Sequence, residues 1–270
     1  MPLVNPDGYT YSITTDRMWR KNRANTTDSG CYGVDLNRNF NVSWGNVNGA
    51  SLSQCSYNFC GTEAFSEPES RAIRDLALAY LPNIKLFMTL HSYGQLLLYP
   101  WGYTFDKAPK KGKLHGMARK IIGHTSSRGT YDFVFGQSSW VLYRATGTSD
   151  DYMYSKGVPF SYTLELPNEN SFILPAMDII PIGQQIWEAL VCIIGDVVKT
   201  TKAKKFCNKR LVVATTSDNI TISNWVRRSM PLEKAKEKII KRYEKKQMSK
   251  LLLQQKLKQK REGARKKKMR

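Results

Sequence analysis

Two polar residues stand in apolar runs at positions where active-site chemistry is common. His91 follows the apolar run 86–90, and the chain breaks soon afterwards at Gly94. Such a run is typical of a buried strand, and in open α/β sheets ligands bind where strands end. His91 is therefore a candidate metal ligand or catalytic base. A hydrogen-bonded core residue is the alternative, and it is the commoner role of a lone histidine.

Glu165 is the second such residue. It lies in the run 160–166, where Phe160, Tyr162 and Leu164 alternate with smaller or polar residues. A carboxylate buried in such a strand has a raised pKa and can act as a general base. The alternative is a glutamate on the solvent face of a half-buried strand.

Two arginine-containing segments could bind anions. Arg17, Arg20 and Arg23 lie close to Trp19 in the sequence. This basic cluster either binds an anion or forms a solvated face of the protein. Asn37-Arg38-Asn39 places a planar guanidinium between two amides, which is a good receptor for a carboxylate.

The elements that would position these residues alternate between helix and strand. Ser66, with Pro68 just inside, predicts the start of a helix, and the strand ending at His91 follows. Further helices are predicted over 112–126 and 180–198. The Asn-, Gly- and Ser-rich residues 5–62 predict loops around short strands. This alternation favours the α/β class.

Positive charge is concentrated at one end of the chain. The net charge is +20, and residues 227–270 contain 19 Lys and Arg against 4 Glu. We predict three parts: a domain over 1–201, a linker over 202–230, and a tail over 231–270 that is helical or disordered. Basic tails bind polyanions nonspecifically.

The sequence also restricts the cellular setting. No run approaches the roughly 18 apolar residues of a membrane span, so we predict none, and no signal peptide is visible. The spacing of the five cysteines fits no CxxC zinc module. Glycosylation sequons near the clustered cysteines favour a secretory origin.

Taken together and in this order, the polar segments resemble the zinc metallocarboxypeptidases of the carboxypeptidase A/B type, with some segments most similar to carboxypeptidase O. The resemblance runs from about residue 3 to residue 200. It rests on Asn5-Pro6-Asp7-Gly8-Tyr9, Arg17-Met18-Trp19-Arg20-Lys21, Gly33-Val34-Asp35-Leu36-Asn37-Arg38-Asn39-Phe40, Ser66-Glu67-Pro68-Glu69, His91-Ser92-Tyr93, Leu98-Tyr99-Pro100-Trp101-Gly102-Tyr103, Ser149-Asp150-Asp151 and Thr163-Leu164-Glu165-Leu166. It implies a three-layer αβα fold around a mixed, twisted sheet, an extracellular location, and hydrolysis of the C-terminal residue of peptides.

The resemblance assigns three residues to the chemistry. His91 corresponds to the last of three protein ligands to a catalytic zinc. Glu165 corresponds to the general base, and Arg20 to the group that stabilises the oxyanion. A three-ligand zinc keeps an open position for water and lowers its pKa.

The resemblance also assigns the substrate-binding residues. Asn37, Arg38 and Tyr143 correspond to the groups that bind the C-terminal carboxylate, and Tyr93 is a further candidate for substrate binding. Asp150 corresponds to the base of the specificity pocket, where an acid selects a C-terminal Lys or Arg. The alternative is that Asp150 only caps a turn.

This chain departs from the family in its zinc ligands. The family's first two ligands come from a His-x-x-Glu motif upstream of the matched segments, and neither His115 nor His124 is followed by Glu three residues on. We therefore expect an N-terminally truncated domain that lacks the first strands of the sheet, has one of three zinc ligands, and has little or no activity. The resemblance also implies a Cys31–Cys55 disulfide and a free Cys60.

Three functions follow as hypotheses. The first is a carboxypeptidase-family protein whose reaction, here on C-terminal Lys or Arg, is impaired. The second is a non-catalytic binder of peptide or protein C-termini. The third is polyanion binding through the basic tail.

Overall fold

The structure, a computed structural model, describes residues 1–25, 30–127, 129, 131–168, 171–198 and 207. The chain divides into two compact units, Met1–Asn219 and Ile220–Arg270, and the described residues belong to the first. The predicted linker and tail lie outside the described residues, apart from Cys207.

A four-stranded mixed sheet forms the middle layer, in the order β1-β4-β2-β3. The strands are β1 (Leu86–Ser92), β2 (Leu96–Tyr99), β3 (Val134–Gln137) and β4 (Phe160–Leu166). β1 runs parallel to β4, β2 runs antiparallel to β4, and β3 runs parallel to β2. The strands predicted at 86–91 and 160–166 are confirmed.

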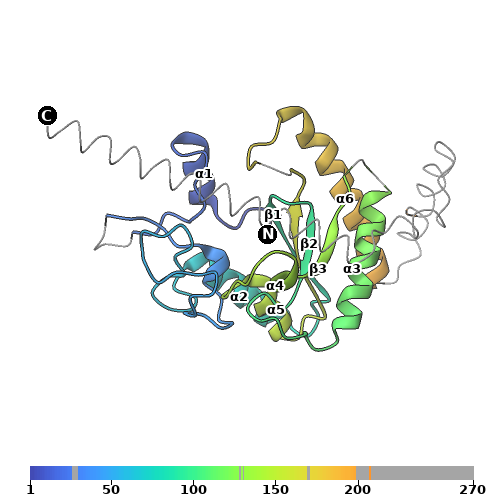
Figure 1. Cartoon of the computed structure of the whole chain (residues 1–270), viewed down its shortest axis with the longest axis horizontal. Coiled ribbons are helices and arrows are strands. Elements are labelled where there is room, and N and C mark those ends of the chain that lie inside the picture. The colour runs from blue at the N-terminus through green and yellow to red at the C-terminus, as the bar shows by residue number, and fades with distance from the viewer. Residues whose placement is uncertain (26–29, 128, 130, 169–170, 199–206, 208–270) are drawn as a thin grey trace, which may run out of the picture. The chain divides into compact units, whose positions relative to one another are not determined.

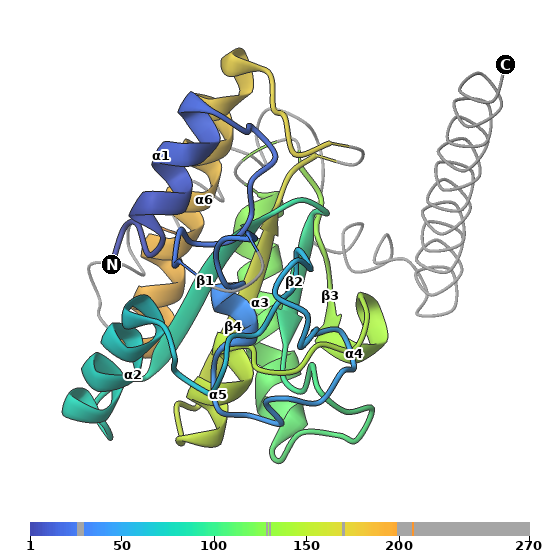
Figure 2. The ribbon, with the colours of Figure 1, turned by 90° about the vertical axis from the view of Figure 1, so that its left-hand side faces the viewer.

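Helices cover both faces of the sheet. Figure 1 shows α3 (Lys111–Ser126) and α6 (Ala176–Val198) side by side on one face. α2 (Pro68–Tyr80) and α5 (Ser149–Ser155) lie on the other. Figure 2 shows the sheet face-on, with its strands side by side in the order β1-β4-β2-β3. The predicted three-layer αβα fold with a mixed sheet is therefore confirmed for the described part of the chain.

Two apolar cores hold the layers together. The larger core joins strand residues such as Leu97, Tyr162 and Leu164 to Leu114 and Ile121 of α3 and to α6. The smaller core, on the opposite face, joins aromatic and aliphatic residues that include Phe40, Phe65, Tyr152, Met153 and Val158. Alternate residues of β1 and β4 therefore point to different cores, as the period of a strand requires.

β1 differs from its prediction as a buried strand. It lies at an edge of the sheet, its residues are half-buried or exposed, and Leu90 is 51% exposed. The run of apolar residues predicted the strand correctly, but a neighbour on only one side leaves it partly open.

Helix boundaries also differ in places. α2 is capped at Glu67 rather than Ser66, whose hydroxyl donates to Glu67 Oε1. The third helical prediction began at residue 180, whereas α6 begins at Ala176 and contains Pro181. In 5–62 the described residues form α1 (Pro6–Thr14) and the short 3-10 helix η1 (Leu36–Arg38) in place of the predicted strands. α4 (Ser138–Val141) was not predicted.

α6 is the one helix, among the residues that the structure describes, with the length and apolar composition to cross a membrane. Core helices of globular proteins often satisfy the same criterion. Ile182, Ile186, Ala189 and Ile193 of α6 lie in the larger core against α3.

Disulfides fix two further segments. Cys31 and Cys55 are bonded and Cys60 is free and buried, so both expectations are confirmed. Cys192 of α6 is bonded to Cys207, a pairing that the sequence did not predict.

Candidate functional site

His91 and Glu165 are brought together by the pairing of β1 with β4. They occupy the same register position of the parallel pair, near the carboxyl ends of both strands. Partners in register point to the same face of a sheet, here the face that carries α5. The β1–β4 pairing therefore brings together two residues that are 74 positions apart in the sequence.

His91 is held as a neutral imidazole. Its Nε2 lies 3.1 Å from the Thr89 hydroxyl on the same face of β1. Burial, assisted by the positive charge of Arg20, lowers the pKa of His91 from 6.5 to about 4. Neutral imidazole is the form that binds metals.

This lowered pKa predicts a pH dependence. Between pH 6.5 and about 4, His91 is protonated in the unfolded chain but stays neutral in the folded one. The free energy of unfolding therefore falls as the pH falls through this range. From pH 7 to 5 the loss is about 2 kcal/mol. The free energy of unfolding would be measured with urea at pH 7 and pH 5 for the parent and for His91→Gln. The decrease between the two pH values should be about 2 kcal/mol smaller in the variant, which lacks the titrating group. Identical pH dependence in the two proteins would contradict the assignment.

Asp35 organises the second part of the site. Its carboxylate is buried; Oδ2 accepts a hydrogen bond from Arg20 Nε at 2.7 Å, and Oδ1 accepts one from the backbone N–H of Asn37 at 3.1 Å. Burial alone would raise the pKa of Asp35, but the charges of Arg20 and Arg38 outweigh burial and lower it. Asp35 in turn raises the pKa of Arg20 above its already high value. One buried carboxylate therefore orients both Arg20 and η1.

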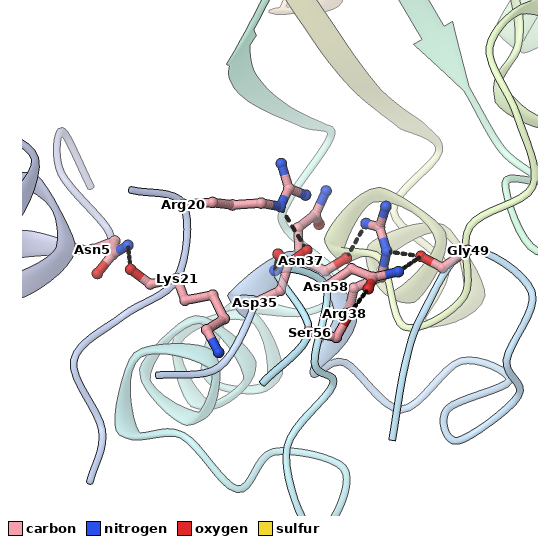
Figure 3. Close-up of polar contacts among 9 residues, drawn as sticks. All are labelled: Asn5, Arg20, Lys21, Asp35, Asn37, Arg38, Gly49, Ser56 and Asn58. Atoms are coloured by element: carbon pink, nitrogen blue, oxygen red, sulfur yellow. Dashed lines mark hydrogen bonds and ion pairs between the residues drawn. The ribbon is translucent and has the colours of Figure 1, made fainter. Parts of the chain in front are cut away.

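Arg38 and Asn37 are fixed by their neighbours. Arg38 donates from Nε to Gly49 O at 2.6 Å and from Nη1 to Asn37 O at 2.7 Å. Asn37 Oδ1 accepts from the backbone N–H of Ser149, at 2.9 Å. That bond leaves the Asn37 amide nitrogen as the group that can donate to a ligand. Figure 3 shows this amide between the guanidinium groups of Arg20 and Arg38.

Two glycines permit this arrangement. Gly147 has φ of +67°, and a Cβ there would lie 2.1 Å from Arg38 O. Gly49 has φ of +77°, and a Cβ there would lie 2.1 Å from Arg144 O. Backbone packs directly on backbone around Arg38, which holds the guanidinium in place.

Asp150 is the next candidate residue. It is buried in the first turn of α5, directly after Ser149. Burial raises the pKa of its carboxyl, and the hydroxyls of Thr148 and Thr163 offset only part of that effect. A buried acid of this kind is stabilised by a cationic ligand. Its neighbour Asp151 accepts hydrogen bonds from the backbone of Gly102 and Tyr103, so Asp151 holds the following loop.

The two predicted tyrosines lie at the edge of the site. Tyr143 is 41% exposed, and it contributes, after Asp35, to raising the pKa of Arg20. Tyr93 follows β1 and packs edge-to-face with Phe172, with 4.7 Å between the centroids of the two rings. Arg23, which was considered as an anion ligand, instead stacks on the rings of Tyr11, Trp19 and Tyr32.

The described residues do not provide the three ligands of a catalytic zinc. The chain has three histidines. His91 lies on β1, whereas the other two histidines lie on α3. There His115 contacts the Tyr99 hydroxyl, and His124 pairs with Asp196 of α6. In the described part of the chain no three His, Cys, Asp or Glu side chains form a group that could hold a metal ion. Neutral His91 is chemically suited to bind zinc, but the described residues do not supply the other protein ligands of a catalytic zinc.

The chain is similar in sequence to several known carboxypeptidases. The chain is 38% identical to carboxypeptidase O of Bos taurus over 219 residues, covering 79% of this chain and 58% of that protein. It is 42% identical to carboxypeptidase B of Astacus astacus over 205 residues, covering 74% and 67%. The chain therefore spans between about half and two thirds of the length of these relatives.

Solved structures show the same fold. Bovine thrombin-activatable fibrinolysis inhibitor, in a complex with tick carboxypeptidase inhibitor, superposes with a TM-score of 0.70 and 38% identity over 74% of this chain and 68% of that one. Carboxypeptidase A from Helicoverpa armigera gives a TM-score of 0.63 and 33% identity over 82% and 52%. A model of the zinc carboxypeptidase family matches residues 1–189. The chain belongs to the zinc carboxypeptidase family.

Proposed function

We propose that this chain recognises the free C-terminus of peptides that end in Lys or Arg. The observation that carries the proposal is the Asn37 amide lying between the guanidinium groups of Arg20 and Arg38. Asn37 also accepts a hydrogen bond from Ser149, the residue before buried Asp150. A guanidinium and an amide bind a carboxylate through charge-assisted hydrogen bonds. The buried carboxyl of Asp150 would supply a complementary charge for a basic C-terminal side chain.

Hydrolysis is the reaction of the family, and Glu165 and Arg20 are the residues that we assign to it as general base and oxyanion-stabilising group. We propose that this chain alone hydrolyses peptides weakly or not at all, because its described residues do not complete the zinc ligands. We also propose a secretory location, since the Cys31–Cys55 disulfide is typical of oxidising compartments.

Binding of matched peptides tests recognition of the C-terminus. Calorimetry would compare one peptide ending in Lys with the same peptide carrying a C-terminal amide. The free acid should bind at least about tenfold more tightly, because the amide removes the charge that Arg38 would recognise. Equal affinities would reject the proposal.

Asp150→Asn tests the preference for basic residues. Its affinity for a peptide ending in Lys should fall about 30-fold or more, since a buried charge pair is lost. Its affinity for a control peptide ending in Leu should not fall. Because burial raises the pKa of Asp150, the charged carboxylate opposes folding, and the variant should be more stable than the parent at pH 7. Unchanged selectivity would leave Asp150 a structural residue.

A further inference from the structure

A strongly cationic surface lies away from the site, on α3 and the loop before it. It comprises six basic residues: Lys107, Lys110, Lys111, Lys113, Arg119 and Lys120. Lys111 is half-buried and the other five are exposed. No Asp or Glu occurs from residue 107 to residue 127. We call these six residues the α3 cationic surface.

These charges have no counterion in the described part of the chain. The ion pairs described there are Arg20–Asp35, Arg74–Asp75 and His124–Asp196, and none involves the α3 cationic surface. None of the six side chains is hydrogen-bonded to another described group either. Repulsion between neighbouring cations is therefore not offset within this part of the molecule.

The charge pattern does not stabilise helix α3. The first turn of a helix favours acidic residues, yet Lys110, Lys111 and Lys113 surround the start of α3, which has no acidic residue in that turn. Positive charge at this end is unfavourable for the helix. Stability of α3 therefore does not explain why these lysines are present.

The opposite side of α3 keeps the surface rigid. Leu114, Ala118 and Ile121 are almost completely buried in the larger core. Lys113 and Lys120 are separated by two turns, about 10 Å along the axis. Lys113 and Lys120 therefore lie on the same exposed side of the helix at a fixed separation, and Lys107 and Lys110 precede its first turn.

We propose that the α3 cationic surface binds a linear sulfated polysaccharide. Fixed cations without counterions gain most from a multivalent, extended anion, because several counterions are released at once. The Cys31–Cys55 disulfide favours an oxidising compartment, where sulfated polysaccharides rather than nucleic acids are the abundant polyanions. α3 has no Phe, Tyr or Trp on which a base could stack.

Lysine footprinting on the full chain tests the proposal directly. Heparin would be added as the probe, exposed lysines acetylated, and the extent of acetylation at each lysine measured by mass spectrometry. Lys107, Lys110, Lys113 and Lys120 should be protected at least about threefold, whereas exposed Lys85 and Lys156 should not. Equal acetylation with and without heparin at these four lysines would overturn the proposal, whatever the basic tail does.

A matched pair of double variants gives the second measurement. Lys113→Gln with Lys120→Gln should weaken heparin binding about tenfold and lower the salt dependence by about two released ions. Lys85→Gln with Lys156→Gln removes the same charge elsewhere and should change little. Equal effects would overturn the proposal. So would tighter binding of a DNA duplex than of heparin at the same salt concentration, because that would assign the surface to nucleic acid.

Discussion

Asp35→Ala should lower the free energy of unfolding by about 1.5–3 kcal/mol, the usual worth of a hydrogen bond to a charged group, because the buried carboxylate is lost while its partner Arg20 remains partly exposed to water. Asp35 is 3% exposed and faces two guanidinium groups, those of Arg20 and Arg38. Removing its carboxylate leaves two neighbouring cations without the charge that offsets them. It also removes the side-chain acceptor of the Asn37 N–H at the start of η1. Urea unfolding followed by circular dichroism measures the change.

Asp35→Asn is the control that separates charge from hydrogen bonding. Its side-chain oxygen can still accept from the Asn37 N–H, but it no longer balances Arg20. Its loss of stability should fall between those of the parent and Asp35→Ala. A loss below about 1 kcal/mol in Asp35→Ala would show that the pair is worth no more than a surface ion pair.

Arg38→Gln has the second large effect, on ligand binding. A peptide with a free C-terminal carboxylate should bind about tenfold more weakly, because a buried, fixed guanidinium is lost. The affinity for the amidated peptide should stay the same, so the ratio between the two should approach one. Calorimetry with the two peptides measures the ratio.

Arg38→Lys provides the matched control for charge. Lysine keeps the charge but lacks the planar group whose Nε and Nη1 bond Gly49 O and Asn37 O. It should retain only part of the preference for the free acid. Full retention of that preference in Arg38→Gln would place recognition of the carboxylate elsewhere.

Local patterns predicted the elements that carry the site. The apolar run 86–90 and the alternation over 160–166 gave β1 and β4, and the helix predicted over 112–126 is α3 within one residue. α1 was missed, although Asn5 caps it and Pro6 begins it, because the Asn- and Gly-rich composition around it favoured loops. That β1 is an edge strand is a property of the sheet, which no run of residues encodes.

The site shows a similar division. The types of His91, Glu165, Asn37 and Arg38 indicated their chemistry, but their proximity depends on the β1–β4 register and on the bond from Ser149 to Asn37. Asp35 was not singled out, although an acid next to an Asn-Arg-Asn segment was an available signal. Its role becomes visible only when Arg20, distant in sequence, reaches its carboxylate.

Zinc content tests the central proposal, that the chain holds groups able to bind a peptide although its described residues lack a complete set of zinc ligands. The purified full chain and its His91→Gln variant would be equilibrated with zinc, dialysed against zinc-free buffer, and measured by atomic absorption. Both should retain the same small amount, far below one zinc per chain, because one histidine holds zinc weakly. Near-stoichiometric zinc in the parent that is lost in His91→Gln would contradict the claim.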